Sequence, residues 1–324
     1  MFTPPDDLDL DLLDEVVRAG WGIEAVEMDY QAVGFGSHHW LATAADGDRW
    51  FVTVDVLSAK PSGFDGLQRA LDSARVLRHD AGLGFVIAPD LTVDGETLRR
   101  VGDAHAVAVY GIVNGYALRP GRFPSNDLRV DVLRLVAAVH HASPAVTAIA
   151  GRADFELPSR AGIEAALDEL GVEWTGGPYA EPARELLAHH AADVRRGLAT
   201  FDRLVDAVMT SAAPWVLTHG EPHAQNVMIT DAGPVLIDWD TALIAPPERD
   251  LWMLMDGDDS LDAYAEITGH RPDPNALMLY RLGWHLGEAA GYTVDVRRPH
   301  RHTTDSQVGW GGLGHSIAVL DRLA

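Results

Sequence analysis

"LTHGEPHAQNVMITDAGPVLIDWD", residues 217–240, is the stretch from which the fold is best predicted. Its runs "NVMIT" and "PVLID" are short and apolar, and the "DAG" between them is typical of a turn. If the two runs fold as an antiparallel hairpin, Asn226 and Asp238 lie at the same open end. The loop "HGEPHAQ" enters at that end too, so we expect the side-chain oxygens of Glu221, Asn226 and Asp238 to converge.

This cluster of oxygens has a functional interpretation and a plain one. Hard oxygen ligands on a rigid hairpin suit Mg²⁺ shared with nucleotide phosphates, and Glu221 is placed to accept a proton from a nucleophilic hydroxyl. The plain alternative is a surface hairpin with ordinary polar ends. Gly220 and Pro222 favour the functional interpretation, because they fix an unusual backbone and costly local geometry tends to accompany function.

Composition narrows the classes of protein to consider. The chain has 324 residues, 47% of them hydrophobic, which is enough for one large core or two smaller ones. Cysteine is absent, which excludes disulfides and cysteine-based metal sites or nucleophiles. The start "MFTPPDDLDLDLLDEVV" lacks the pattern of a signal peptide. No run of about 18 apolar residues predicts a membrane span, so we expect a cytoplasmic protein.

The charge balance predicts what the surface attracts. Asp and Glu number 48 against 25 Lys and Arg, a formal net charge of −23. Such a surface repels nucleic acids and anionic membranes and attracts small cationic molecules, although solubility alone also explains it. We expect a small-molecule partner, no nucleic acid or membrane partner, and a monomer or a homodimer.

The order of elements predicts an α+β protein. Residues 26–56 contain three strand-like runs, an amphipathic helix follows near 64–81, and "FVIAP" and "AVAVYGIV" are two more strand-like runs. The Gly- and Pro-rich stretch 114–127 is the best candidate linker. We expect a nucleotide-binding lobe over 1–113 and a helical lobe over 114–324. Helices of the second lobe are expected near 128–142, 160–171, 181–209, 248–255, 260–268, 274–291 and 305–323.

"HGEPHAQN" followed by "LIDWD" resembles the catalytic and metal-binding loops of aminoglycoside phosphotransferases and related choline-kinase-like small-molecule kinases. The resemblance implies a two-lobed protein-kinase-like fold, with Mg²⁺ bound by Asn226 and Asp238. It also implies that Glu221 takes the position of the catalytic base and that His219 orients the loop. "PPERDLW" looks like the family's next segment, which implies that Asp250 braces the loop through backbone hydrogen bonds.

The sequence departs from this family pattern at the base position. The family has Asp there, and this chain has Glu221. The extra methylene moves the carboxylate by roughly 1.5 Å, and a misplacement of that size can cost about 100-fold in rate.

A second departure concerns the lysine that grips the nucleotide phosphates from the family's third strand. In "RWFVTVDV" the comparable position is Thr53 or a neighbour, and no lysine occurs there. Lys60 is the only lysine of the chain. It either supplies the missing charge from just after the strand or is a solvated loop residue. The family's partner glutamate on the following helix is missing too, since Asp65 and Asp72 are the only acids between 61 and 79.

The stretch "GFGS" lies where the family's phosphate-covering loop belongs, and its glycines let backbone N–H groups approach an anion. Taken alone, such a pattern is usually a tight turn. We assign seven residues to the nucleotide: Gly34, Phe35, Gly36, Ser37, Lys60, Tyr110 and Ile112.

The remaining histidines and acids raise two further hypotheses. His219 and His223 are four apart, as in helical zinc sites, but Gly220 and Pro222 argue against a helix across them. Acidic residues beyond the metal aspartate suit a cationic acceptor. We assign to the acceptor Asp240, Asp256, Asp258 and Glu288.

We therefore predict an enzyme that transfers phosphate from Mg²⁺-ATP, or GTP, to a hydroxyl of a small cationic molecule such as an aminoglycoside-like antibiotic. Glu221 and His219 form its predicted catalytic set. The alternative is a kinase-like protein that binds nucleotide or a small ligand without efficient transfer. The absent strand lysine and Glu221 favour the alternative, and Asn226 with Asp238 oppose it.

Overall fold

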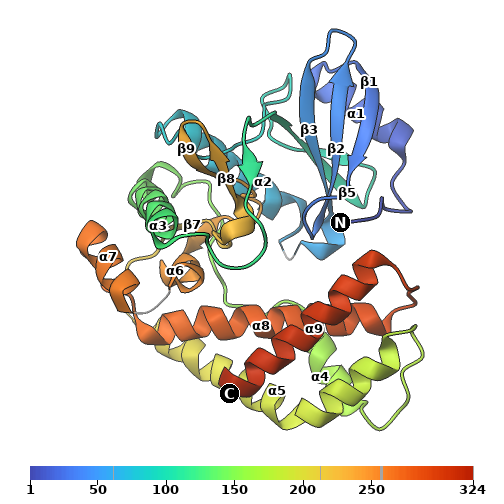
Figure 1. Ribbon diagram of the computed structural model, residues 1–324, viewed down its shortest axis with the longest axis vertical. Helices are drawn as coiled ribbons and strands as arrows, with labels where there is room; N and C mark the ends of the chain where they lie inside the picture. The colour runs from blue at the N-terminus through green and yellow to red at the C-terminus, as the bar shows by residue number, and fades with distance from the viewer. Residues whose placement is uncertain (61, 212, 256–257, 324) are drawn as a thin grey trace. The chain divides into compact units, whose positions relative to one another are not determined.

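The computed structural model describes residues 1–60, 62–211, 213–255 and 258–323. The chain forms two compact units, coloured by residue number in Figure 1. The first unit comprises Met1–Ala153 and Pro214–Arg271, and the second comprises Asp154–Ala213 and Pro272–Ala324. The predicted linker lies inside the first unit. The lobe boundary at residue 113 thus differs from the division into these units, and as a functional division it stays a prediction.

The larger sheet of the first unit has five antiparallel strands in the order β1-β2-β3-β5-β4. The strand-like runs predicted over 26–56 and 106–113 are confirmed as four of these strands. The sheet and its two helices comprise α1 (Leu10–Trp21), β1 (Ala25–Gln31), β2 (Ser37–Ala44), β3 (Arg49–Val56), α2 (Gly63–His79), β4 (Arg99–Val101) and β5 (His105–Gly111).

The alternation of side chains along the strands assigns each face of this sheet to one helix. Val54 and Val107 pack with Leu13 and Val17 of α1, whereas Ala106 and Ala108 pack with Leu67 of α2. Thr53 pairs with Ala108, and Asp55 pairs with Ala106. Since directly paired residues point to the same face, Thr53 and Asp55 share the α2 face.

The helix α1 was not predicted from the sequence. Asp9 caps it by accepting hydrogen bonds from the backbone N–H groups of Asp11 and Leu12. Leu13 and Val17, four apart, are buried, and Gly22 ends the helix with a φ of 69°. The cap, the spacing and the terminal glycine are ordinary helix signals. The helix was missed because it has only about three turns and lies among many acidic residues.

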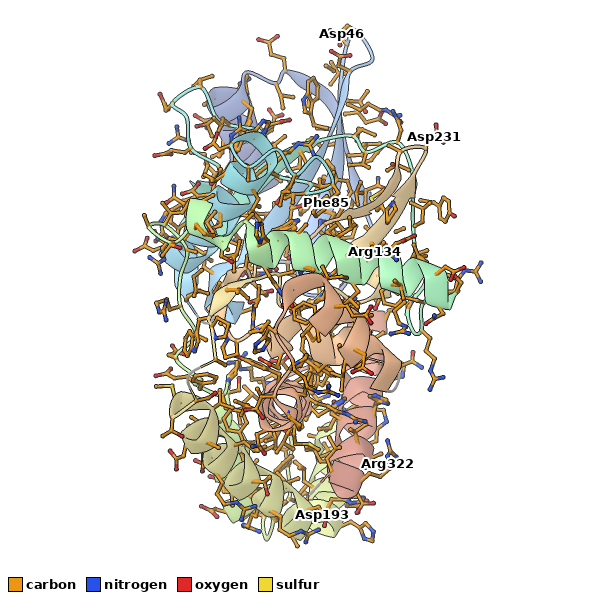
Figure 2. The ribbon with its side chains drawn as sticks, turned by 90° about the vertical axis from the view of Figure 1, so that its left-hand side faces the viewer. Asp46, Phe85, Arg134, Asp193, Asp231 and Arg322 are labelled. Atoms are coloured by element: carbon orange, nitrogen blue, oxygen red, sulfur yellow. The ribbon has the colours of Figure 1, made fainter. Side chains whose placement is uncertain are left out.

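The predicted hairpin is present in the first unit. It lies in a three-stranded sheet of order β6-β8-β9, in which Asp231 marks the turn (Figure 2). Its strands are β6 (Tyr116–Ala117), β8 (Val227–Thr230) and β9 (Gly233–Leu236), and a separate pair consists of β7 (Val216–Thr218) and β10 (Leu243–Ala245). The run "FVIAP", expected as a strand, makes only one parallel bridge, from Val86 to Leu236 of β9. The prediction that this run is a strand was wrong. Its backbone is held by hydrogen bonds with β9 and with side chains of α2, and not by pairing within the five-stranded sheet.

Three helices complete the first unit: α3 (Asn126–His141), α6 (Glu248–Leu254) and α7 (Asp258–Thr268). Short 3₁₀ turns cover Leu57–Ala59, Ser143–Ala145 and Ala224–Asn226. Arg134 marks the outer side of α3 in Figure 2. The opposite side of α3 is buried through Val132, Val136 and His140.

The second unit is helical and consists of α4 (Arg160–Asp168), α5 (Ala180–Met209), α8 (Pro274–Arg297) and α9 (Thr304–Leu323). Leu187, Leu198, Leu286 and Leu320 belong to its core and are at most 5% exposed. The predicted helices are confirmed with ends shifted by a few residues, the largest shift being the end of α8 at Arg297. A β-rich start followed by a helical remainder confirms the predicted fold class.

Candidate functional site

The hairpin brings the predicted metal ligands to one end. Val227 of β8 lies opposite Leu236 of β9. One step further out, the backbone N–H of Ile237 donates to the carbonyl of Asn226 over 3.0 Å. Asn226 and Asp238 therefore flank the open end, as the sequence predicted.

The loop that enters at this end is fixed by its backbone. Gly220 has a φ of 100°, and a Cβ added there would lie 2.6 Å from the hydroxyl of Thr241 and 2.5 Å from the guanidinium of Arg249. Only glycine fits both the conformation and the space. The residues from His219 to His223 form no helix, as Pro222 suggested.

His219 uses both ring nitrogens on backbone groups. The N–H of Glu221 donates to Nδ1 over 3.2 Å, so Nε2 carries the proton and donates to the carbonyl of Ile237 over 2.9 Å. Burial lowers the pKa of His219, which favours this neutral ring. His219 thus ties the loop to the hairpin. Since neither of its ring nitrogens is left for a metal, the zinc hypothesis for His219 and His223 receives no support.

Asn226 holds the backbone of Glu221 in the same loop. Its side-chain N–H donates to the carbonyl of Glu221 over 3.0 Å, so the amide oxygen is not used in this bond. Glu221 is therefore held at its N–H by His219 and at its carbonyl by Asn226. Its carboxylate lies 3.7 Å from Nε2 of His223. The backbone of the predicted base is fixed at both ends.

Asp250 anchors the same loop at the two residues before Glu221. Its carboxylate accepts hydrogen bonds from the backbone N–H of His219 over 2.9 Å and of Gly220 over 2.6 Å. Burial opposes ionisation of Asp250, but the hydrogen bond from His140 outweighs it and lowers the pKa. The brace that the resemblance implied is confirmed at both amides.

Asp238 has a backbone conformation that is uncommon for a residue other than glycine, with a φ of 68°. Desolvation by the surrounding protein, and then the charges of Asp240 and Glu221, raise the pKa of Asp238 well above its ordinary value. The protein therefore holds several carboxylates where a cation would relieve their repulsion.

Lys60 reaches into this acidic group. Its ammonium lies 2.8 Å from Asp55 at the end of β3 and forms a second ion pair with Asp240. Burial favours the neutral amine, but Asp240 and Asp55 outweigh it and raise the pKa of Lys60 well above its ordinary value. With 14% of its side chain exposed, Lys60 is not a solvated loop residue.

The position on β3 at which the resemblance implies a lysine holds Thr53 or a neighbour. The hydroxyl of Thr53 lies 3.2 Å from Nδ1 of His39 on the neighbouring strand. The ring of His39 stacks on Phe51 with centroids 5.0 Å apart. On the same face, Ser37 donates to Asp55 over 2.6 Å. The face thus connects the glycine-rich stretch, through Ser37 and Asp55, to Lys60.

The other residues assigned to the nucleotide lie around this face. Gly34 and Gly36 have φ values of 68° and 107°, in the region that favours glycine. Phe35 between them is 48% exposed. Tyr110 of β5 is half-buried, and burial, followed by the charges of nearby carboxylates such as Asp55, raises its pKa. Ile112, just past β5, is 37% exposed.

The residues assigned to the acceptor belong to both units. Asp240 pairs with Lys60. Asp256 lies outside the described residues, as does the side chain of Asp258 at the start of α7. Glu288, on α8 of the second unit, is half-buried and accepts a hydrogen bond from Tyr292. Their roles in acceptor binding stay predictions.

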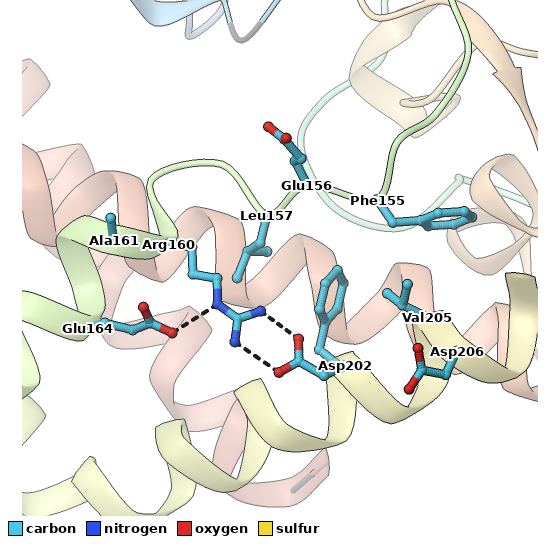
Figure 3. A pocket seen from close by; sticks show the side chains of 10 residues that line it. Phe155, Glu156, Leu157, Arg160, Ala161, Glu164, Asp202, Val205 and Asp206 are labelled. Carbon is cyan, nitrogen blue, oxygen red and sulfur yellow. Dashed lines mark hydrogen bonds and ion pairs between the residues drawn. The ribbon is translucent and has the colours of Figure 1, made fainter.

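The second unit contains a pocket of about 500 Å³ that was not predicted (Figure 3). Phe155, Leu157, Phe201 and Val205 give it apolar walls. Arg160 binds Asp202 over 2.5 and 2.9 Å and Glu164 over 2.9 Å. The other carboxylates lining it are Glu156 and Asp206, so the lining carries four carboxylates and one guanidinium.

Comparison with known proteins assigns the chain to a family. Residues 32–284, which include the glycine-rich stretch and the hairpin, match the model of the phosphotransferase enzyme family. The chain belongs to this family. Protein StrN from Streptomyces griseus is 31% identical over 251 residues, which is 74% of this chain and 73% of that protein.

Solved structures share the fold. Spectinomycin phosphotransferase APH(9)-Ia, solved with ADP and spectinomycin, superposes with a TM-score of 0.75 at 16% identity, covering 97% of this chain and 98% of that one. Amicoumacin kinase hAmiN, solved with AMP-PNP, Ca²⁺ and Ami, gives 0.62 at 13% identity, covering 97% and 93%. A choline/ethanolamine kinase family protein from Mesorhizobium loti gives 0.52 at 16% identity, covering 97% and 94%. The kinase-like fold is thereby confirmed.

Sequence reasoning missed several residues around the site. Asp55 was not singled out, although its alternation with Thr53 on β3 and its pairing with Ser37 of β2 place it on the same face. His140 of α3 contacts Asp250, and Tyr264 of α7 contacts His140; no sequence signal connects residues so far apart. Among the described residues, no helix is both long and apolar enough to cross a membrane.

Acidification should destabilise the protein through His39. Burial, followed by neighbouring positive groups, lowers the pKa of His39 to about 4, from 6.5 in an ordinary setting. As pH falls below that unfolded value, the unfolded chain takes up a proton that the folded protein does not, so stability is lost as the pH falls towards the folded pKa.

The variant His39→Gln keeps a hydrogen-bonding group near Thr53 and does not titrate. Between about pH 7.5 and pH 5 it should lose less stability than the wild type, by on the order of 2 kcal/mol. Urea unfolding of both proteins at the two pH values measures the difference. An equal loss in both proteins would contradict the prediction.

Proposed function

We propose that this protein transfers the terminal phosphate of ATP to a hydroxyl of a small, amine-bearing molecule. The observation that carries the proposal is the fixed convergence of Glu221, Asn226 and Asp238 at the open end of the hairpin. Membership of the phosphotransferase family supports the class of reaction, and the ADP and spectinomycin held by a structural neighbour fit it.

The donor set of the hairpin fits Mg²⁺. Asp238 offers a carboxylate, and Asn226 offers an amide oxygen whose orientation is set by the bond from its N–H to Glu221. Both are hard oxygen ligands of the kind that Mg²⁺ takes together with phosphates. When bound, the metal would neutralise charge that develops on the transferred phosphate.

Glu221 is proposed to accept the proton of the acceptor hydroxyl. Its backbone is fixed at the N–H and at the carbonyl, so only the side-chain torsions remain to be set. A fixed backbone offsets part of the cost of the longer side chain, because the carboxylate searches a small volume. His219 is proposed to orient this loop and does not itself react.

The nucleotide is proposed to lie against the α2 face of the five-stranded sheet. The glycine-rich loop from Gly34 to Ser37 would cover its phosphates, and Tyr110 and Ile112 would border the base. Lys60 is proposed to supply the cation that β3 lacks. Arg75 and Arg78 are poorer candidates, because their guanidinium groups already bind backbone carbonyls of Pro89, Gly84 and Val86. ATP and GTP both remain candidate donors.

A cationic acceptor is supported by charge. The net charge of −23 draws cations toward the protein, and the pocket of the second unit has apolar walls and an excess of carboxylates. Such a pocket suits a molecule with an amine and an apolar body. An amine-bearing antibiotic is proposed as the acceptor, with ATP or GTP as the donor.

The second candidate function is ligand binding without efficient transfer. The observation that favours it is the neutralisation of Lys60 by Asp55 and Asp240, which leaves little net positive charge for phosphate. The two candidates differ in whether phosphate reaches an acceptor.

The transfer test uses labelled ATP and GTP with a panel of hydroxyl compounds that carry amines. The wild type should phosphorylate at least one of them, and Glu221→Gln should lower kcat by about 100-fold or more with little change in KM for the acceptor. A wild type that binds ADP but labels no compound would establish the binding-only candidate. Equal turnover by Glu221→Gln would remove Glu221 as the base.

The metal test uses Asp238→Asn, because asparagine tolerates the positive φ of this residue. The variant should keep the stability of the wild type and lose the gain in ATP affinity that Mg²⁺ gives. Asp231→Asn, at the exposed turn of the same hairpin, is the matched control. Calorimetric titration with and without Mg²⁺ decides, and an unchanged Mg²⁺ dependence in Asp238→Asn would refute the assignment.

The lysine test separates the roles of Lys60 and Asp240. Lys60→Ala should weaken ADP binding by about 1.5–3 kcal/mol, whereas Arg75→Ala should have a much smaller effect. Asp240→Asn should strengthen Mg²⁺-free ADP binding, because a carboxylate that competes with phosphate for Lys60 is removed. If Lys60→Ala binds ADP as the wild type does, Lys60 is only a structural ion-pair partner.

A further inference from the structure

A buried chain of hydrogen bonds leads from α7 through α3 to the loop of Glu221. The hydroxyl of Tyr264 lies 2.7 Å from Nδ1 of His140, and Nε2 of His140 lies 3.0 Å from Asp250. Asp250 in turn receives the N–H groups of His219 and Gly220. Tyr264 is 2% exposed, His140 5%, and Asp250 is fully buried.

The chemistry of the groups fixes the direction of these bonds. Asp250 is ionised and can only accept, so Nε2 of His140 carries a proton and donates. Burial raises the pKa of Tyr264, which keeps its hydroxyl protonated. In the neutral ring Nδ1 is the acceptor, so Tyr264 donates to His140 and His140 donates to Asp250. Nδ1 of His140 then accepts from Tyr264, and Nε2 donates to Asp250, so both ring nitrogens are hydrogen-bonded.

The chain of hydrogen bonds ends at the loop that carries Glu221, where small displacements matter. Both carboxylate oxygens of Asp250 are engaged, Oδ1 with Gly220 and Oδ2 with His219 and His140. A rotation of this carboxylate would move two consecutive amides, and Glu221 is the next residue. Since His140 is the side chain that contacts Oδ2, it sets the rotation of Asp250 and hence the place of Glu221.

We propose that His140 and Tyr264 are positioning residues, which hold Asp250 in the one rotation that aims Glu221 at the acceptor hydroxyl. The proposal rests on the proposed function, in which Glu221 is the base. A purely structural role would be expressed in stability alone. A positioning role would lower kcat while leaving nucleotide binding in place.

The test compares His140→Leu, which removes both bonds, with His140→Gln, whose amide nitrogen can still donate to Asp250. Tyr264→Phe removes only the hydroxyl. His141→Leu, at the next and exposed residue of α3, is the control for the helix. For each variant, kcat, the two KM values, the affinity for ADP and the midpoint of urea unfolding are measured.

We expect His140→Leu to lower kcat by about 100-fold, the cost of a misplacement near 1 Å, with KM and ADP affinity within about threefold. His140→Gln should recover at least tenfold of this loss, and Tyr264→Phe should lower kcat by roughly three- to tenfold. His141→Leu should match the wild type. Equal kcat in His140→Leu and the wild type would overturn the proposal, as would losses that follow unfolding midpoints without rescue by glutamine.

Hydrogen exchange supplies a readout that does not require turnover. The amides of His219 and Gly220 should exchange at least tenfold faster in His140→Leu than in the wild type, and His140→Gln should restore part of the protection. If the wild type transfers no phosphate but the exchange pattern holds, the proposed function fails, whereas the positioning of the loop by His140 through Asp250 stands. Unchanged exchange in His140→Leu would overturn this positioning role.

Discussion

The buried carboxylate of Asp250 is the constraint on which the rest of the site depends. A buried charge is costly unless it is fully hydrogen-bonded, and Asp250 meets this requirement with two amides of the loop that carries Glu221 and the imidazole of His140. The loop cannot move without leaving that charge unsatisfied. Gly220 has a conformation and a space that only glycine fits, so sterics leave the loop one arrangement at this residue. Rigidity here comes from electrostatics and packing together.

On the sheet side of the same unit, Lys60 is the centre of an ion-pair cluster. Lys60 lies between Asp55 and Asp240, and Ser37 links Asp55 to the glycine-rich loop. A charge placed just after the strand thus connects three segments that are distant in sequence. Under the proposed function, a polyphosphate would compete with both carboxylates for one ammonium. Affinity for nucleotide would then depend on this exchange of anionic partners.

The parts of the structure that were predictable from sequence are those encoded locally. The hairpin, the place of Asn226 and Asp238, the strands over 26–56 and the long helices follow from turn residues and periodicity. The contacts of Lys60 with Asp240, 180 residues away, and of His140 with Tyr264 depend on tertiary packing, which no local pattern reports. "FVIAP" failed for the same reason, since its apolar character reflects burial beside β9 and not membership of the larger sheet.

The uniqueness of Lys60 has a practical consequence. With one lysine in 324 residues, a sample labelled with ¹⁵N only at lysine gives a single side-chain ammonium signal, and that signal comes from the middle of the acidic cluster. Burial and two ion pairs slow the exchange of its protons with water. The protein therefore carries a built-in spectroscopic probe, which reports changes around Asp55 and Asp240 without any engineered residue.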